Sequence, residues 1–171
     1  MELLNLDLKN IVYIQSEAEF SRAKTKGFWE VMGSLVTGHR PHLLSFDEFA
    51  HNLQPQQIVY AGLQDIPTKA IIGSAGRYRD FTRHFFPSLS DERGKERWRT
   101  IYTLAVSGAG FPPIEVYQIE TVYFVQNGHH RVSVATYLGW TSIQAHVTVL
   151  PSLPGEAVDF ADQPYGRKGV N

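Results

Sequence analysis

The chain contains no cysteine and has almost no surplus of either charge. Without cysteine, disulfide bridges, thiolate nucleophiles and zinc sites built on cysteine are all excluded. A formal net charge of −1 gives no global attraction to nucleic acid or to acidic lipid. Any affinity of that kind would have to come from a local patch of basic residues.

Long hydrophobic runs are also missing. The longest apolar runs, such as residues 122–125, are far shorter than the roughly 20 residues that a membrane-spanning helix needs. The first ten residues carry acids and lack the basic start of a secretory signal. We therefore expect a soluble cytoplasmic protein with no membrane partner. A chain of 171 residues with 43% hydrophobic content is also long enough for one good core.

The first third of the chain is helical in pattern. Ser16 and Glu19 have the spacing of a capping box, in which each side chain satisfies a backbone amide at the helix start. Apolar residues then recur at steps of three and four, and Gly38 is placed as a stop. The pattern predicts a helix over about 16–37.

A second, shorter helix is expected after Ser45, which repeats the capping pattern with Glu48 and is followed by Pro55 as a stop. Residues 1–60 are therefore interpreted as an N-terminal helical extension. It packs on the main domain or builds a homodimer contact, and the sequence does not choose between these. Residues 151–171 are rich in proline and glycine and poor in apolar side chains, so we expect a tail.

The middle of the chain gives mixed signals. Residues 57–61 and 69–72 have the composition of short strands or strand-like connections on either side of Pro67. In residues 76–87 aromatic side chains fall at helical spacing, which predicts a short amphipathic helix that ends at Pro87.

A longer helix is predicted after Ser90, which we expect to act as its N-cap. Asp91 and Glu92 would lie in its first turn, where carboxylates face the positive end of the helix dipole. Gly108 and Gly110 would end it. These signals define one well-bounded helix.

β-branched and aromatic residues dominate the last third. Residues 114–119 and 121–126 predict a hairpin, and residues after Arg131 change to a helical period that ends at Gly139. A final strand is expected over about 142–150. Residues 61–150 are therefore expected to contain both strands and helices.

The strongest chemical signal is the turn between the hairpin and the following helix. Gly128 there is followed by His129, His130 and Arg131. Backbone amides converge at a helix start, where the helix dipole also favours an anion, and glycine lets a ligand approach the backbone closely. Arginine offers a planar fork to two phosphate oxygens, and histidines add further hydrogen bonds. The turn therefore predicts a phosphate site.

The binding free energy available at this turn shows what else such a ligand needs. Three charge-assisted hydrogen bonds at roughly 1.5 to 3 kcal/mol each, less an association cost of at least about 4 kcal/mol, fall short of the roughly 8 kcal/mol that micromolar binding needs. A useful ligand must therefore fill a pocket with its remaining parts, as the ribose and base of a nucleotide do. Arg77 and Arg79 are the expected second contacts to such a ligand.

These residues also carry a family resemblance. The run from Gly110 through Val116, the hairpin, Gly128 to Arg131, and then Ala135, Gly139 and Ile143 resembles the ParB and sulfiredoxin superfamily. The resemblance covers about residues 65–150. It implies that residues 61–150 form a small domain of the α/β fold class, with a mixed sheet packed against helices. It also implies that this domain holds nucleotide phosphates at the strand-to-helix turn, with Gly128, His130 and Arg131 in that role.

Three branches of this superfamily can be compared at the motif. Sulfiredoxins have a reactive cysteine where this chain has His129, so their reduction chemistry is excluded. ParB partition proteins carry Gly-Glu-Arg-Arg, and the glutamate that assists a metal-bound triphosphate is missing here. The free serine kinases carry Asp-Gly-His-His-Arg, which this chain matches except at Asn127. The resemblance of this chain to these kinases implies phosphotransfer, for which Glu115 or Glu120, with His130, would be the catalytic candidates.

Several hypotheses therefore stand together. The preferred one is a nucleotide-binding protein that takes ATP, ADP or a related nucleotide, with or without Mg²⁺, at residues 127–131. It would transfer a phosphoryl group or sense the nucleotide. The rival is a DNA-binding or nuclease-like ParB relative that uses the basic segment 77–99. A third is a structural module, in which the two histidines bond local carbonyls. No metal site is expected, because adjacent rings at a helix start diverge.

Overall fold

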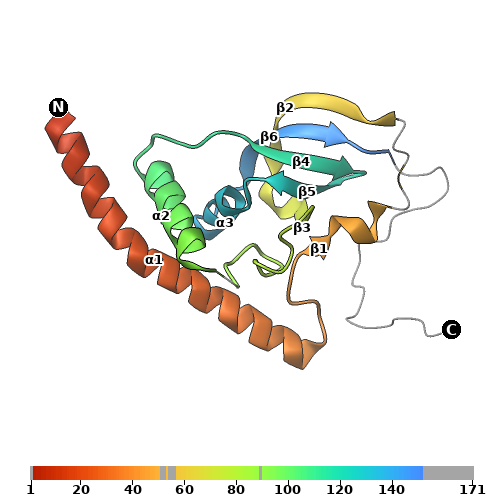
Figure 1. The fold of residues 1–171 in the computed structure, drawn as a ribbon, viewed down its shortest axis with the longest axis horizontal. Helices are drawn as coiled ribbons and strands as arrows, with labels where there is room; N and C mark the ends of the chain where they lie inside the picture. Colours follow the sequence, from red (N-terminus) through yellow and green to blue (C-terminus); the bar gives the residue numbers. More distant parts are fainter. Residues whose placement is uncertain (1, 51–52, 54–56, 89, 152–171) are drawn as a thin grey trace.

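The structure, a computed structural model, describes residues 2–50, 53, 57–88 and 90–151, and the side chains among them from residue 7 onward. These residues form one mixed sheet with helices packed on it (Figure 1). The elements in chain order are α1 (Glu2–Thr37), β1 (Leu44–Ser45), the 3₁₀ turn η1 (Phe46–Glu48), β2 (Val59–Pro67), the 3₁₀ turn η4 (Thr68–Ala70), β3 (Ile71–Ser74), α2 (Glu92–Val106), β4 (Ile114–Ile119), β5 (Val122–Asn127), α3 (His129–Tyr137) and β6 (Ser142–Val149).

The sheet has six strands in the order β1-β3-β5-β4-β6-β2. The β4–β5 hairpin and the β2–β6 pair are antiparallel, whereas β1–β3, β3–β5 and β4–β6 are parallel. This mixed sheet with helices confirms the expected α/β fold class. Because β3 and β5 are parallel neighbours, their carboxyl ends lie at the same edge of the sheet, and the candidate site is built there.

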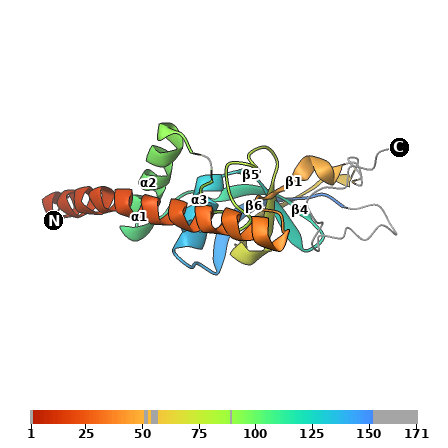
Figure 2. The same cartoon turned by 90° about the horizontal axis from the view of Figure 1, so that it is seen from below.

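The helices form layers outward from the sheet. α3 and the sheet enclose the main core, which includes Val132, Ala135, Val116 and Val125. A second cluster joins α1, α2 and α3 around the fully buried Trp98. Figure 2 shows that α1 lies along the outside, with its N-terminal turns extending past the rest of the fold. None of the helices in the described part is long and apolar enough to cross a membrane.

The helix expected over about 16–37 is longer than predicted. It begins at Glu2, and Ser16 lies in its interior, where the buried hydroxyl donates to the Tyr13 carbonyl at 2.5 Å. Serine inside a helix can bond the preceding turn in this way, so the capping pattern was wrong as a start signal. The stop was right, because Gly38 adopts φ +72° and its amide bonds the Ser34 carbonyl.

The helix predicted over 76–87 is wrong. The segment is a loop in which the Ser74 hydroxyl accepts from the Gly76 and Arg77 amides, and Thr82 pairs with Phe86 through its backbone. Phe85 has φ +60°, outside the helical region. The aromatic spacing that suggested a helix instead reflects two side chains, Phe81 and Phe85, buried from a non-helical loop.

The region before the sheet also differs in part. In the described residues directly after Ser45 the chain forms the 3₁₀ turn η1 where the predicted helix would begin, and the Ser45 side chain makes no capping bond. Phe46 of that turn stacks on Tyr117 with ring centroids 4.9 Å apart, so packing on the sheet replaces the predicted second helix. Pro55 and the tail from residue 152 lie outside the described residues. The two short segments expected on either side of Pro67 correspond to one long strand, β2, which Pro67 ends, and to η4 with β3.

The remaining elements follow the sequence closely. The hairpin, α3 and β6 form as predicted, with φ +52° at Glu120 in the hairpin turn and φ +75° at Gly139 after α3. The N-cap of α2 is Asp91 and not Ser90, because the Asp91 carboxylate accepts from the Gly94 amide at 2.8 Å. Gly94, in the first turn of α2, lies close to the His130 ring at the start of α3.

Candidate functional site

The turn into α3 is shaped around a glycine. Gly128 is the N-cap of α3 and has φ +106°, a conformation that residues with a side chain rarely adopt. A Cβ atom added there would lie 2.6 Å from Cγ2 of Ile114. Both the backbone angle and the close approach to β4 therefore require glycine, which turns the chain sharply from β5 into the helix.

The two histidines that follow both point into the protein. His129 is 6% exposed and His130 is 8% exposed, although they lie in the first turn of α3. Phe81 contacts both rings, stacked against His129 and edge-on to His130. Burial, helped by the charge of Arg77, lowers the pKa of each imidazole to about 4. Both rings are therefore neutral near pH 7 and add no positive charge there.

His129 has a clear partner. Its Nε2 lies 2.7 Å from the Ser74 hydroxyl oxygen at the carboxyl end of β3. That oxygen already accepts from the amides of Gly76 and Arg77, so its own hydrogen is directed at the ring. His129 then accepts through Nε2 and fixes the β3 end to the α3 start.

His130 has no such partner. Both of its ring nitrogens are buried and lack a hydrogen-bond partner anywhere in the described part of the chain. Leaving one buried polar group unsatisfied costs about 1–3 kcal/mol. A buried imidazole with both nitrogens unpaired is therefore a position at which a ligand would form hydrogen bonds that the described residues do not.

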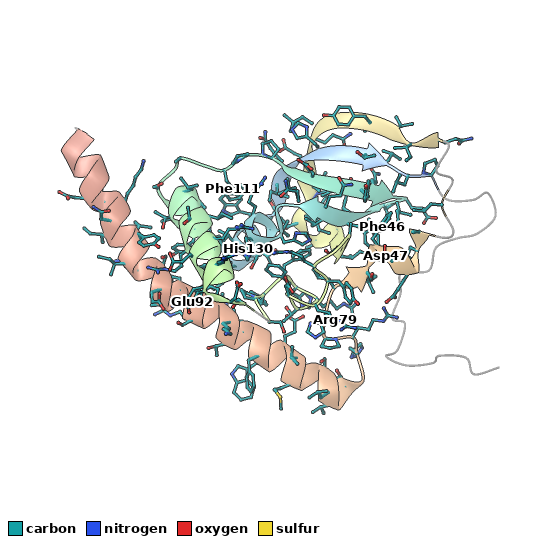
Figure 3. The ribbon with its side chains drawn as sticks, viewed as in Figure 1. Phe46, Asp47, Arg79, Glu92, Phe111 and His130 are labelled. Carbon is teal, nitrogen blue, oxygen red and sulfur yellow. The ribbon has the colours of Figure 1, made fainter. Side chains whose placement is uncertain are left out.

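The start of α2 faces the same ring. A Cβ atom added at Gly94 would lie 3.7 Å from Cε1 of His130, and Figure 3 shows His130 beside this helix. Arg77 and Arg97 lower the pKa of His130, whereas Asp91 raises it, so all three charges act at this point. The first turns of α2 and α3 thus meet at one unsatisfied imidazole, on which two arginine charges and one opposing carboxylate act.

Arg131 is placed differently from the expectation. Its Nη1 donates to the carbonyls of Pro112 at 3.1 Å and Pro113 at 2.5 Å, which braces the loop before β4. Burial lowers the pKa of Arg131, and the nearby Glu115 carboxylate opposes this effect. Part of the predicted phosphate fork is therefore committed to the protein itself.

The other predicted site residues are not all brought together. Glu115 is exposed on β4, in register with Asn127 on β5, and acts on Arg131 and not on His130. The guanidinium of Arg79 lies over its neighbour Tyr78, 5.4 Å from the ring centroid. Of the predicted second contacts, only Arg77 acts on the two histidines.

Sequence reasoning missed four residues of this arrangement. Ser74, Asp91, Gly94 and Arg97 come from β3 and α2, far from the motif in the chain. Ser74 follows a short β-branched run, and pairing that run in parallel with residues 122–127 would have placed it at the same sheet edge. Among the described residues, no group of three or more His, Asp or Glu side chains is placed to hold a metal ion.

No protein-family model matches the sequence. No curated protein sequence matches it either. Six chains of solved structures do match. One of them is sulfiredoxin from Arabidopsis thaliana, to which this chain is similar at 19% identity and a TM-score of 0.36, over 50% of this chain and 82% of that one.

Proposed function

We propose that the protein binds a phosphate group, carried by a nucleotide, at the junction between the N-termini of α2 and α3. The observation that carries this proposal is the buried imidazole of His130, whose two nitrogens have no partner in the described part of the chain. A phosphate oxygen would accept a hydrogen bond from one of these nitrogens.

The surroundings of His130 suit an anion. Helix geometry leaves the amides of His129 and His130 without acceptors in α3, and those of Glu92 and Arg93 without acceptors in α2. Both helix dipoles direct their positive ends to this junction. Arg77 and Arg97 add positive charges that already act on the ring of His130, against the single negative charge of Asp91. An anion would offset the charge that now opposes protonation of this imidazole.

The roles of the motif residues follow from this placement. Gly128 makes the turn, His129 holds Ser74, His130 contacts the phosphate, and Arg131 braces the loop before β4. Glu115 acts on Arg131 and not on His130, which supports binding more than phosphoryl transfer. Any Mg²⁺ would arrive with the nucleotide.

The basic segment 77–99 gives less support to DNA binding. Arg99 pairs with Glu17 at 3.2 Å and Glu96 at 2.8 Å, and Lys95 pairs with Glu17 at 2.7 Å. These cations join α2 to α1, so they are not available to a line of DNA phosphates.

The proposal is tested by a thermal-shift and titration series with inorganic phosphate, AMP, ADP and ATP, each with and without Mg²⁺. Saturation to 100 times Kd should stabilise the protein by roughly 2.7 kcal/mol. The informative variant is His130→Leu. Because it removes an unsatisfied polar ring, the unliganded stability should stay equal or rise while binding is lost.

His39→Gln, at an exposed histidine after α1, is the matched control and should bind like the wild type. Arg97→Gln should weaken binding without unfolding the protein, since Arg97 is exposed. If no ligand of the series stabilises the wild type, or if His130→Leu binds as tightly, the proposal is wrong.

A further inference from the structure

A cavity of about 430 Å³ extends along β3 from its start to Leu44, which pairs with Gly73 near the end of that strand. Lys69 and Ile71 line it where β3 begins, and Val122 lines it where β5 begins. The junction lies where the same two parallel strands end, at Ser74 and Asn127. None of the described residues that line the cavity belongs to the phosphate junction, so the two are separate places in the fold.

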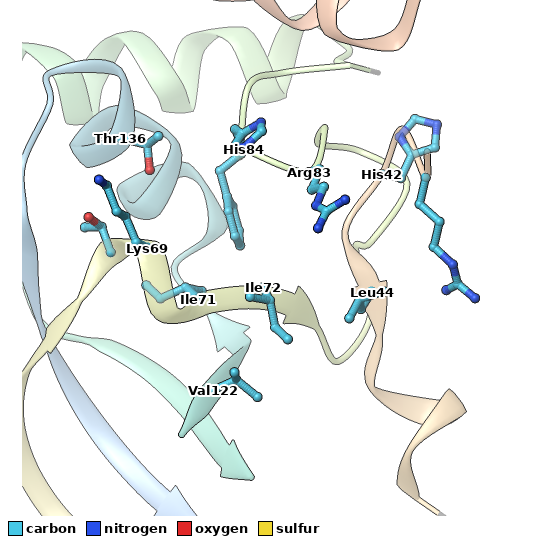
Figure 4. Close-up of a pocket in the computed structure, with 12 residues that line it drawn as sticks. His42, Leu44, Lys69, Ile71, Ile72, Arg83, His84, Val122 and Thr136 are labelled. Carbon is cyan, nitrogen blue, oxygen red and sulfur yellow. The ribbon is translucent and has the colours of Figure 1, made fainter. Parts of the chain in front are cut away.

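The walls of this cavity combine apolar and cationic side chains. Figure 4 shows Ile71 and Ile72 along β3, with Leu44 and Val122 near them. The remaining apolar wall is Phe85, which is 2% exposed. Five basic side chains also line the cavity, namely Arg40, His42, Lys69, Arg83 and His84, whereas none of the described lining residues is acidic. Such walls fit a ligand with an apolar body and a negative group.

The basic side chains lie at both ends. In Figure 4, Lys69 lies at one end of the cavity, with Arg83 and His42 at the other. Arg40 is paired with Glu48 at 2.7 Å and His84 with Glu30 at 2.9 Å. Lys69 forms no ion pair with any residue that the structure describes, so its ammonium group is available to an anion.

The wall opposite β3 is held in place from α1. The Glu30 carboxylate accepts from the Thr82 hydroxyl at 2.6 Å, from the His84 amide at 3.1 Å and from the His84 ring at 2.9 Å. The next residue, Phe85, keeps φ +60°, which is rare for an aromatic residue. A strained residue fixed by its surroundings is typical of binding sites that are formed before the ligand arrives.

We propose that this cavity binds a small amphipathic organic anion, whose apolar body lies on Ile71, Ile72 and Phe85 and whose carboxylate reaches Lys69. Apolar burial supplies most of the affinity, and the ammonium group selects the charged ligand. The proposal holds whether or not the α2–α3 junction binds phosphate.

The probes are octanoate and its neutral analogue 1-octanol, titrated against the full chain and followed by protein-observed NMR. Octanoate should bind about fivefold more tightly than 1-octanol in the wild type, and Lys69→Gln should remove this preference. Lys9→Gln, at an exposed lysine on α1, should leave it unchanged. Octanoate should also shift the resonances of Ile71 and Ile72.

Ile72→Trp gives a second, independent variant because the larger ring should fill the cavity and block both probes. If this variant fails to fold, Lys69→Gln still decides the outcome. Equal affinity for the two probes, an unchanged preference in Lys69→Gln, or absence of binding would each overturn the proposal.

Discussion

At the scale of single residues, the two adjacent histidines do different work although they are equally buried. His129 has a hydroxyl partner in Ser74, whereas His130 has none among the described residues. The sequence predicted a chemical role for this pair from the glycine before it and the helix after it. It could not predict that both rings would be neutral, because their pKa values depend on burial by Phe81 and on Arg77, which come from a distant loop.

The lowered pKa values predict loss of stability in acid. Burial lowers the pKa of each ring from its ordinary value of 6.5 to about 4 in the folded state. The unfolded chain therefore binds more protons below about pH 6.5, so the free energy of unfolding should fall as the pH drops. From about pH 8 to about pH 5 the loss should be about 2 kcal/mol for each ring. Urea unfolding at several pH values measures it.

His130→Leu separates this effect from general acid unfolding. The variant should lose less stability over the same pH range, because one of the two buried imidazoles is gone. His39→Gln should keep the full loss. Equal pH dependence in all three proteins would show that His130 is protonated as easily in the folded state as in the unfolded chain.

Gly128 supports a prediction with a matched control. In Gly128→Ala the new Cβ atom would meet Ile114 at 2.6 Å, at a backbone angle of +106°. We expect a loss of more than about 2 kcal/mol of unfolding free energy. Gly139→Ala has φ +75° and nothing within 4 Å of the new atom, so its loss should be about 1 kcal/mol. Similar losses in the two variants, measured by urea unfolding, would mean that the contact with Ile114 relaxes without cost.

At the scale of elements, sequence patterns predicted the turns and helix ends whose backbone conformation depends on a few neighbouring residues. The hairpin turn, the stop at Gly38 and the start of α3 all depend on a few neighbouring residues. Residues 76–87 failed because their aromatic spacing records contacts with other elements. Phe81, for example, is buried against the two histidines of α3.

The N-cap of α2 offers a test at this scale. The structure assigns the cap to Asp91, whose carboxylate accepts from the Gly94 amide, and not to Ser90 as the sequence suggested. Asp91→Ala should therefore cost about 1 kcal/mol of unfolding free energy, whereas Ser90→Ala should cost little. Thermal unfolding of both variants compares them directly. A larger loss in Ser90→Ala would return the cap to the position predicted from the sequence.

At the scale of the whole molecule, the sequence predicted which segments are strands but not their order in the sheet. The parallel pairing of β3 with β5 is a long-range contact, and no local pattern encodes it. That pairing brings Ser74 to the histidines, and the packing of α2 on α3 brings Asp91, Gly94 and Arg97. The motif therefore gave the centre of the candidate site, while its periphery depended on the tertiary fold.

The packing of α1 predicts that the N-terminal helix and the sheet domain unfold together. Phe20 is 5% exposed and meets the fully buried Trp98 edge-on, 5.5 Å between ring centroids. Glu19 accepts a hydrogen bond from Tyr137 of α3, and Arg99 of α2 donates to Ser16. Helical propensity alone rarely holds a helix of this kind, so its stability should come from these contacts.

Phe20→Ala should therefore cost about 3 kcal/mol and shift a single unfolding transition seen by both far-ultraviolet circular dichroism and tryptophan fluorescence. Val36→Ala, at a side chain that is 88% exposed on the same helix, should change little. If α1 were an independent extension, Phe20→Ala would melt the helix signal early and leave the sheet domain's transition in place. Two separated transitions in the variant would establish that arrangement, whereas one shared transition would show that the Trp98 cluster couples α1 to the fold that carries the candidate site.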